Sequence, residues 1–350
     1  MSKKRVAVLG AGSFGTALSK LLHENGHDVL LWGRDRTVLS AMKEHRMNIR
    51  YLPDVPLPSI AVSDDLEKAL YGRDLVVFAV PSQAMRSVVS AAKTYIPDHA
   101  LLVHTAKGLE RESGMRMSEV MRDVLPPSFF NRVSALSGPS HAEEVARGLP
   151  TTVVVASDEE KVSREVQSIF FAPSFRVYIN QDLLGVELSG SLKNIIALGA
   201  GISDGLGFGD NAKAALLTRG LAEIARLGVK LGAHPLTFLG LAGMGDLIVT
   251  ATSRHSRNWR TGKMLGEGMR LDAALATIGM VVEGVKTTEA AYRMSRHHEV
   301  EMPITTALYA VLFEGLSAEE AVPMLMGRER TDEGHALLLD IWERNRQEER

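Results

Sequence analysis

Short apolar segments alternate with segments of helical periodicity along the first half of the chain. Residues 5–9 form a β-branched apolar run, residues 16–24 carry apolar side chains at helical spacing, and residues 28–32 are apolar again. Further apolar runs follow at 75–80, 101–103, 133–136, 152–155 and 175–179. Because strands this short and this uniformly apolar are buried on both faces, the pattern predicts a parallel sheet covered by helices.

The pattern changes after about residue 181. From there on, apolar residues recur at helical spacing, β-branched runs are rare, and Gly205, Gly207, Gly209 and Gly228 are typical of helix ends. We therefore expect an α/β Rossmann-type dinucleotide-binding domain over residues 1–182, followed by an all-α substrate domain over 183–350. The length of 350 residues suffices for two domains of ordinary size.

Composition narrows the classes of function. Lys and Arg number 40 against 42 Asp and Glu, so no basic excess indicates a nucleic-acid partner. The absence of cysteine excludes disulfides, thiolate metal sites and a thiol nucleophile, and it fits a reducing compartment. No H-E-x-x-H spacing occurs, and no apolar run approaches the ~18 residues that span a bilayer. We expect a cytoplasmic protein with no metal, no nucleic acid and no membrane span.

A glycine fingerprint follows the first predicted strand and opens the first predicted helix, at Gly10-Ala11-Gly12-Ser13-Phe14-Gly15. In that context Gly10 permits a tight turn and Gly12 lets the backbone approach a pyrophosphate. Gly15 allows the helix to pack closely on the strand, and the helix N-terminus attracts the anion. The fingerprint predicts a dinucleotide site, with an ordinary glycine turn as the alternative.

The end of the second predicted strand indicates which dinucleotide binds. An acidic residue there would hold the ribose 2′-hydroxyl of NAD, but the chain reads Trp32-Gly33-Arg34-Asp35. The guanidinium of Arg34 favours the 2′-phosphate of NADP, while Asp35 leaves NAD possible. We expect NADP(H) as the preferred cofactor and NAD(H) as an accepted one.

The helical half contains polar residues whose neighbours are apolar or have small side chains. Lys193 follows Ser189 and Gly190 by one helical turn, which would leave room for a ligand beside it. A solvated lysine is the alternative interpretation. The glycine-dense stretch Gly199–Asn211 suits either a flexible loop or a close approach of two backbones.

Two more stretches offer groups that bind anions. Asp246 follows Gly243-Met244-Gly245, and Ser256-Arg257-Asn258 presents hydroxyl, guanidinium and amide donors in succession. Such donors can clamp a phosphate or a carboxylate. The alternative for Ser256 is the N-cap of a helix in a surface loop.

Together these motifs resemble the NAD(P)-dependent glycerol-3-phosphate dehydrogenases of the bacterial type. The resemblance covers nearly the whole chain, in the family's order and approximate spacing, and rests on Gly10–Gly15, Lys107-Gly108-Leu109-Glu110, Ser137-Gly138-Pro139-Ser140-His141-Ala142, Leu192-Lys193-Asn194, Thr218-Arg219-Gly220, Gly243-Met244-Gly245-Asp246 and Ser256-Arg257-Asn258. It implies a dinucleotide-binding domain followed by a helical substrate domain. It also implies the reversible reduction of dihydroxyacetone phosphate to sn-glycerol 3-phosphate, which supplies glycerophospholipid synthesis.

The resemblance implies a role for individual residues. Lys193 would be the catalytic proton donor and acceptor. The substrate would contact Lys107, Gly138, Ser140, Lys193, Asp246, Ser256, Arg257 and Asn258. The cofactor would contact Ser13, Phe14, Arg34, Lys107, Ala142, Arg257, Val281 and Glu283, besides Gly10, Gly12 and Gly15 of the fingerprint. A homodimer joined through the helical domain is also expected, with apolar stretches such as Leu325-Met326 at the interface.

Charge gives these roles a physical basis. When hydride reaches a ketone carbon, negative charge develops on the oxygen, and a charged Lys193 would stabilise it and deliver the proton. Oxidation would need neutral Lys193, which a nearby Lys107 favours and Asp246 opposes. Oxidation should therefore have a more alkaline optimum than reduction.

Two other functions remain open from the residues alone. A 3-hydroxyacid dehydrogenase shares the two-domain plan and a lysine in the helical domain, and Ser256-Arg257-Asn258 could bind its carboxylate. A non-catalytic NADP-binding sensor would need the cofactor site but no chemistry at Lys193.

Overall fold

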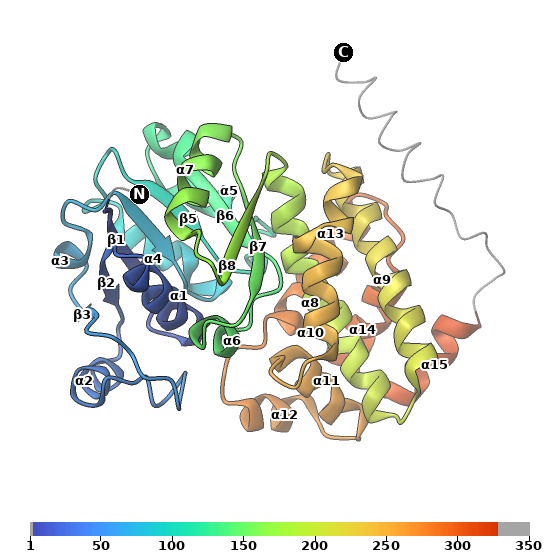
Figure 1. Cartoon of the computed structure of the whole chain (residues 1–350). Coiled ribbons are helices and arrows are strands. Elements are labelled where there is room, and N and C mark those ends of the chain that lie inside the picture. Colours follow the sequence, from blue (N-terminus) through green and yellow to red (C-terminus); the bar gives the residue numbers. More distant parts are fainter. Residues whose placement is uncertain (1–2, 328–350) are drawn as a thin grey trace, which may run out of the picture. The chain divides into compact units, whose positions relative to one another are not determined.

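The computed structural model describes residues 3–327 and divides the chain into two compact units (Figure 1). The first unit comprises residues up to Ala106 and Met117–Leu183, and the second comprises Lys107–Arg116 and the chain from Leu184 onward. Residues 107–116 fall within the predicted first domain, whereas their contacts belong to the second unit. The end of the predicted second domain, residues 328–350, lies outside the described residues.

The first unit is built on one sheet of eight strands in the order β3-β2-β1-β4-β5-β6-β7-β8. The strands are β1 (Arg5–Leu9), β2 (Asp28–Trp32), β3 (Ala61–Ser63), β4 (Leu75–Phe78), β5 (Leu101–His104), β6 (Val133–Ser137), β7 (Thr151–Ala156) and β8 (Phe175–Asn180). Strands β1 to β6 run parallel, with the order 3-2-1-4-5-6 of a Rossmann dinucleotide-binding sheet. The predicted Rossmann-type fold is confirmed.

The last two strands depart from the expected parallel sheet. Strand β7 pairs antiparallel with β6, and β8 runs parallel to β7, so both are reversed relative to the other strands. Between Ser137 and Thr151 the only helix is the short α6 (Ala142–Ala146). A parallel return usually runs through a full crossover helix, and this connection contains only the five residues of α6 in helical form.

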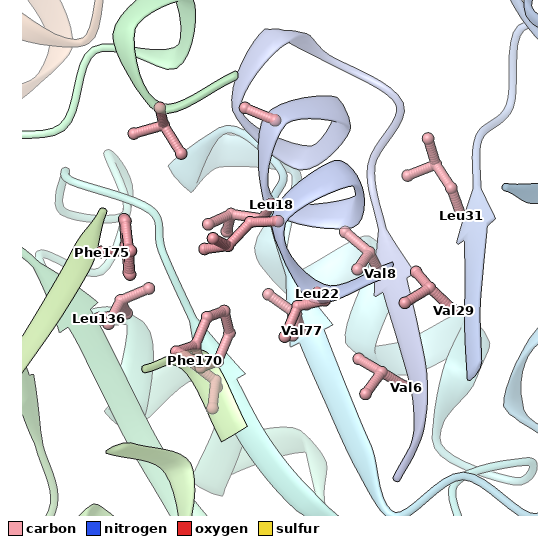
Figure 2. Close-up of a cluster of buried hydrophobic side chains, with 14 of the residues drawn as sticks. Val6, Val8, Leu18, Leu22, Val29, Leu31, Val77, Leu136, Phe170 and Phe175 are labelled. Atoms are coloured by element: carbon pink, nitrogen blue, oxygen red, sulfur yellow. The ribbon is translucent and has the colours of Figure 1, made fainter. Parts of the chain in front are cut away.

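Helices cover the sheet and bury an apolar core against it. They are α1 (Ser13–Glu24), α2 (Arg36–His45), α3 (Leu66–Leu70), η1 (Ser82–Ala84), α4 (Met85–Ala92), α5 (Met117–Val124), η2 (Pro127–Arg132), α6 and α7 (Glu160–Phe170). Figure 2 shows Leu18 and Leu22 of α1 among the side chains of β1 and β4, with Phe170 of α7 beside them. This packing fixes the first residues of α1 at the end of β1.

The second unit is helical, as predicted, apart from its connecting segments. It contains α8 (Leu183–Gly205), α9 (Asp210–Lys230), η3 (Pro235–Leu239), η4 (Leu241–Gly245), α10 (Asp246–Thr252), α11 (Arg257–Gly266), α12 (Leu271–Ile278), α13 (Glu283–His297), α14 (Pro303–Phe313) and α15 (Ala318–Met326). Within the described part of the chain, α8 is the one helix long and apolar enough to cross a membrane, and 94% of its apolar stretch is buried. It is the core helix of this unit.

Glycines bring the backbones of α8 and α11 into contact. A Cβ at Gly201 would lie 2.1 Å from the carbonyl oxygen of Trp259, and one at Gly262 would lie 2.0 Å from that of Leu198. Only glycine permits so close an approach. Within the stretch Gly199–Asn211, Gly201 therefore belongs to a helix crossing, whereas Gly207 and Gly209 lie in the connection between α8 and α9.

Gly228 was predicted at a helix end, but α9 continues past it to Lys230. A Cβ at this position would lie 2.1 Å from the ring of Phe238, so the glycine serves close packing.

Candidate active site

The glycine fingerprint forms a cradle at the end of β1. Gly10 has φ +124°, and a Cβ on it would lie 2.3 Å from the carbonyl oxygen of Ala79, which follows β4. A Cβ on Gly15 would lie 1.9 Å from the carbonyl oxygen of Gly10. Gly12, the N-cap of α1, faces open space, with no atom within 4 Å of a Cβ. The cradle fits a pyrophosphate held on the N-terminus of α1, where Ser13 and Phe14 begin the helix.

A buried asparagine holds this loop in shape. Asn48 donates from Nδ2 to the carbonyl oxygen of Ala11 at 3.0 Å and to the Thr16 hydroxyl at 2.8 Å. Asn48 is not among the predicted site residues, because it lies far from the fingerprint along the chain.

Arg34 and Asp35 follow β2 and differ in their surroundings. The Asp35 carboxylate caps α2 by accepting from the backbone N–H groups of Thr37 and Val38, and its second oxygen lies 2.8 Å from Arg50. Arg34 is exposed. The Asp35 carboxylate is therefore engaged in local structure, and the guanidinium of Arg34 is accessible to a ligand.

Three charged side chains of the second unit meet in a buried cluster. The Asp246 carboxylate, 2% exposed, accepts from Lys193 at Oδ1 and from Lys107 at Oδ2, both at 2.8 Å. Helix α8 supplies Lys193 and α10 supplies Asp246, while Lys107 comes from the segment between β5 and α5. The Lys193 side chain is only 5% exposed, which rules out the alternative of a solvated lysine.

Thr250 completes the surroundings of Lys193. Its hydroxyl accepts from Lys193 and donates to the backbone carbonyl of Asp246 at 2.6 Å, one turn earlier on α10. A π-helical turn, η4, precedes α10 and leads directly into Asp246. Such turns are frequent at functional sites. Thr250 is not among the residues predicted for the site, although its i, i+4 spacing from Asp246 places both on one helix face.

Burial and charge set the protonation behaviour of the cluster. Burial lowers the pKa of Lys193 to about 8, assisted by the charge of Lys107 and opposed by Asp246, in the directions expected from the sequence. Burial by itself would raise the pKa of the Asp246 carboxyl, but the two lysines outweigh it and hold that pKa below its usual range. Asp246 is therefore ionised at neutral pH, while Lys193 is close to its titration point.

Two asparagines link the lysine cluster to α11 and α13. Asn194 donates to the carbonyl oxygen of Lys107 at 2.8 Å and accepts from Asn258 at 2.8 Å. Asn258 in turn accepts from the backbone N–H of Gly284 at 2.9 Å. Asn194 was part of a recognised motif but was not predicted as a site residue, because its partners are remote in sequence.

The N-terminus of α11 carries the remaining donors. Ser256 is the N-cap of α11 and accepts from the backbone N–H of Trp259, but it is buried and does not lie in the surface loop of the alternative interpretation. Arg257 donates to the carbonyl oxygen of Val281 at 2.7 Å, which brings together two of the predicted cofactor residues. Glu283 follows as the first residue of α13.

The predicted site residues are distributed over the two units. The second unit holds Lys107, Lys193, Asp246, Ser256, Arg257, Asn258, Val281 and Glu283, whereas Gly10, Gly12, Ser13, Phe14, Gly15, Arg34, Gly138, Ser140 and Ala142 lie in the first. Gly138 has φ +121° directly after β6, and the Ser140 hydroxyl donates to its carbonyl oxygen at 2.9 Å. Ala142 begins α6.

A dinucleotide cradle on a Rossmann sheet and a helical unit with a buried, titratable lysine define a nicotinamide-dependent dehydrogenase. Comparison with known families gives the particular one. The chain belongs to the NAD-dependent glycerol-3-phosphate dehydrogenase family, whose N-terminal model matches residues 5–163 and whose C-terminal model matches residues 182–323. It is an NAD(P)-dependent oxidoreductase.

Individual relatives agree with this assignment. The chain is 54% identical to the glycerol-3-phosphate dehydrogenase (NAD(P)+) of Bacillus velezensis, over 94% of this chain and 96% of the relative. It is 56% identical to that of Pelotomaculum thermopropionicum, over 94% and 95%. The crystal structure of glycerol-3-phosphate dehydrogenase from Coxiella burnetii superposes with a TM-score of 0.88 at 39% identity, covering 93% of this chain and 99% of that one. The family membership disfavours the hydroxyacid dehydrogenase and sensor alternatives.

Proposed function

We propose that the enzyme reversibly reduces dihydroxyacetone phosphate to sn-glycerol 3-phosphate, with Lys193 giving and taking the hydroxyl proton. The observation that carries this proposal is the buried contact of Asp246 with both Lys193 and Lys107. A lysine whose pKa is about 8 can hold either protonation state near neutral pH. Reversible proton transfer requires both states.

Lys193 transfers its proton to the oxygen atom on which the reaction places negative charge. When bound, the reduced nicotinamide supplies a hydride to the carbonyl carbon. The ammonium group of Lys193 stabilises the charge that develops on the carbonyl oxygen and donates a proton to it. In the reverse direction, the neutral amine of Lys193 removes the hydroxyl proton, and the nearby charge of Lys107 favours that neutral form.

The phosphate of the substrate is proposed to bind at the N-terminus of α11. Ser256, Arg257 and Asn258 are grouped there, where the helix dipole adds partial positive charge. Roles for Gly138 and Ser140 toward the substrate, and for Ala142, Val281 and Glu283 toward the cofactor, rest on their match to the family motifs. The proposed domain division at residues 182/183 assigns the pyrophosphate cradle to the first domain and Lys193 to the second.

NADPH is the proposed preferred cofactor, with NADH also accepted. Asp35 is engaged in capping α2 and pairing with Arg50, which leaves Arg34 to meet the ribose substituent. Arg34→Ala should lower the ratio of kcat/KM for NADPH to that for NADH on the order of tenfold or more, the worth of one charge-assisted contact. Arg36→Ala is the matched control, because Arg36 pairs with Asp64 at 2.5 Å. An unchanged ratio in Arg34→Ala would contradict the preference.

The product supplies backbones for glycerophospholipids, and we propose that the enzyme works in the cytoplasm as a homodimer joined through the helical domain. Analytical ultracentrifugation of the full chain tests the last point. Sedimentation at the mass of a single chain would contradict it.

Loss of nicotinamide absorbance on adding dihydroxyacetone phosphate tests the reaction itself. We expect turnover with this substrate and much less with a 3-oxo acid, because a 3-oxo acid carries no phosphate group for the N-terminus of α11 to bind. Preference for the 3-oxo acid, or NADPH binding without any turnover, would favour the alternatives.

A further inference from the structure

The segment Lys107–Arg116 carries one of the three charges of the cluster, yet it contains no helix or strand. Lys107 acts on Lys193 through space, so its effect depends on where the backbone of the segment is held. A lysine side chain has several rotatable bonds and does not define that position alone.

Both ends of this segment are fastened to one helix. At its start, Asn194 of α8 donates to the carbonyl oxygen of Lys107 at 2.8 Å. At its end, Arg116 pairs with Glu187 of α8 at 2.6 Å. Positions 187 and 194 are two turns apart on the same face of the helix. Between the two ends, the Leu109 side chain is fully buried in the core of the second unit.

The pair at the far end is buried, with the Arg116 side chain 14% exposed and that of Glu187 2% exposed. Removing two such charges from water costs about as much as their attraction returns, so a buried pair adds little net stability. What it does supply is a defined geometry between the two elements that it joins.

We propose that Arg116 and Glu187 are positioning residues for the reaction: their ion pair anchors the segment Lys107–Arg116 to α8 and so fixes the Lys107 charge relative to Lys193. The pair does not touch the substrate and acts through Lys107. The inference deepens the proposed function and rests on it, because it assumes that Lys193 exchanges the proton.

The pH dependence of kcat/KM for dihydroxyacetone phosphate reduction tests the proposal in the full-length enzyme. Glu187→Gln should move the alkaline limb upward by about half a pH unit, since the Lys107 charge is then held less closely to Lys193. The direct loss of a negative charge would move the limb downward, so the direction separates the two causes. Arg116→Lys keeps the positive charge that pairs with Glu187, and this variant should retain the wild-type pH profile.

A second pair of variants covers the case in which Glu187→Gln does not fold. Arg116→Gln and Arg111→Gln each remove one positive charge from the same segment. Arg111 is half-exposed and pairs with Glu289, which keeps Arg293 as a second partner. The direct effect of the lost positive charge is upward in both variants. We expect a clearly larger upward shift in Arg116→Gln than in Arg111→Gln, because only Arg116 holds the segment to α8 through Glu187.

Equal profiles in both arginine variants, or a lower melting temperature of Glu187→Gln with an unchanged profile, would overturn the positioning role. If the wild-type enzyme did not reduce dihydroxyacetone phosphate at all, the proposed function would fail instead. The two failures are therefore distinguishable.

Discussion

Lys193 of α8 and Asp246 of α10 form an ion pair of 2.8 Å in the buried interior of the helical unit. Two opposing effects act on the lysine, since burial favours the neutral amine and the carboxylate favours the ammonium. Their balance leaves Lys193 able to change its protonation state near neutral pH. This balance is the basis of the first prediction.

Replacing the carboxylate should shift that balance toward the neutral amine. In Asp246→Asn, Lys193 loses its counter-charge and keeps the repulsion of Lys107, so its pKa falls further. The alkaline limb of the reduction profile should move to lower pH by about one unit or more. Asp272→Asn, an exposed carboxylate on α12, is the control. An unmoved limb in Asp246→Asn would show that this carboxylate does not hold the proton on Lys193.

Gly12→Val should weaken cofactor binding without unfolding the protein. Gly12 has an ordinary φ of −81°, and no atom lies within 4 Å of a Cβ there. The branched side chain would occupy the space proposed for the pyrophosphate, and the Kd for NADPH should rise on the order of tenfold or more. Protein fluorescence titration measures this, with the melting temperature of the free enzyme as the check on folding. Wild-type affinity would mean that the pyrophosphate binds elsewhere.

Gly262→Ala should destabilise the helical unit. The added methyl group would meet the carbonyl oxygen of Leu198 at 2.0 Å and push α11 away from α8. We expect a loss of about 1–3 kcal/mol in the free energy of unfolding, as for other overpacked cores. Gly209→Ala is the matched control, because its Cβ would meet no atom within 4 Å. Urea denaturation compares the two, and equal stabilities would argue against a tight helix crossing.

The sequence could predict most of the fold because its signals are local. The predicted apolar runs agree with β1, β2 and β4 to β8 to within two residues at each end. Strand β3 escaped notice because Ala61–Ser63 is too short to show alternation. The reversal of β7 depends on the path that the chain takes between β6 and β7, and hydrophobic periodicity does not record that path.

The candidate site was only partly predictable for a related reason. Asp246 and Ser256 stood out by their local motifs. Thr250 and Asn194 became visible only through contacts with residues far away in sequence. The membership of Lys107–Arg116 in the second unit is likewise a tertiary property, set by burial and by pairing with α8.

A glutamate of one helix caps the start of another helix that is far away in the sequence, and this contact leads to a prediction about stability. Glu223 of α9 is buried and accepts from the backbone N–H groups of Ile304 and Thr305, both at 2.8 Å, at the start of α14. In Glu223→Gln one of those donors would face an amide NH2, and we expect a loss of about 1–3 kcal/mol in the free energy of unfolding. Glu320→Gln is the control, since glutamine also serves in the exposed capping box of α15. A similar small effect for both variants would contradict the capping role.

The most direct test of the account compares the pH profiles of reduction and oxidation in the wild-type enzyme and in Lys193→Ala. With a Lys193 pKa of about 8, reduction should be constant below that pH and fall above it, because it needs the ammonium form. Oxidation needs the neutral amine and should rise through the same pH. Lys193→Ala should lose turnover by about 10² or more in both directions while still binding NADPH. Coincident profiles, or near-normal turnover in Lys193→Ala, would contradict the assignment of Lys193 as the proton donor and acceptor.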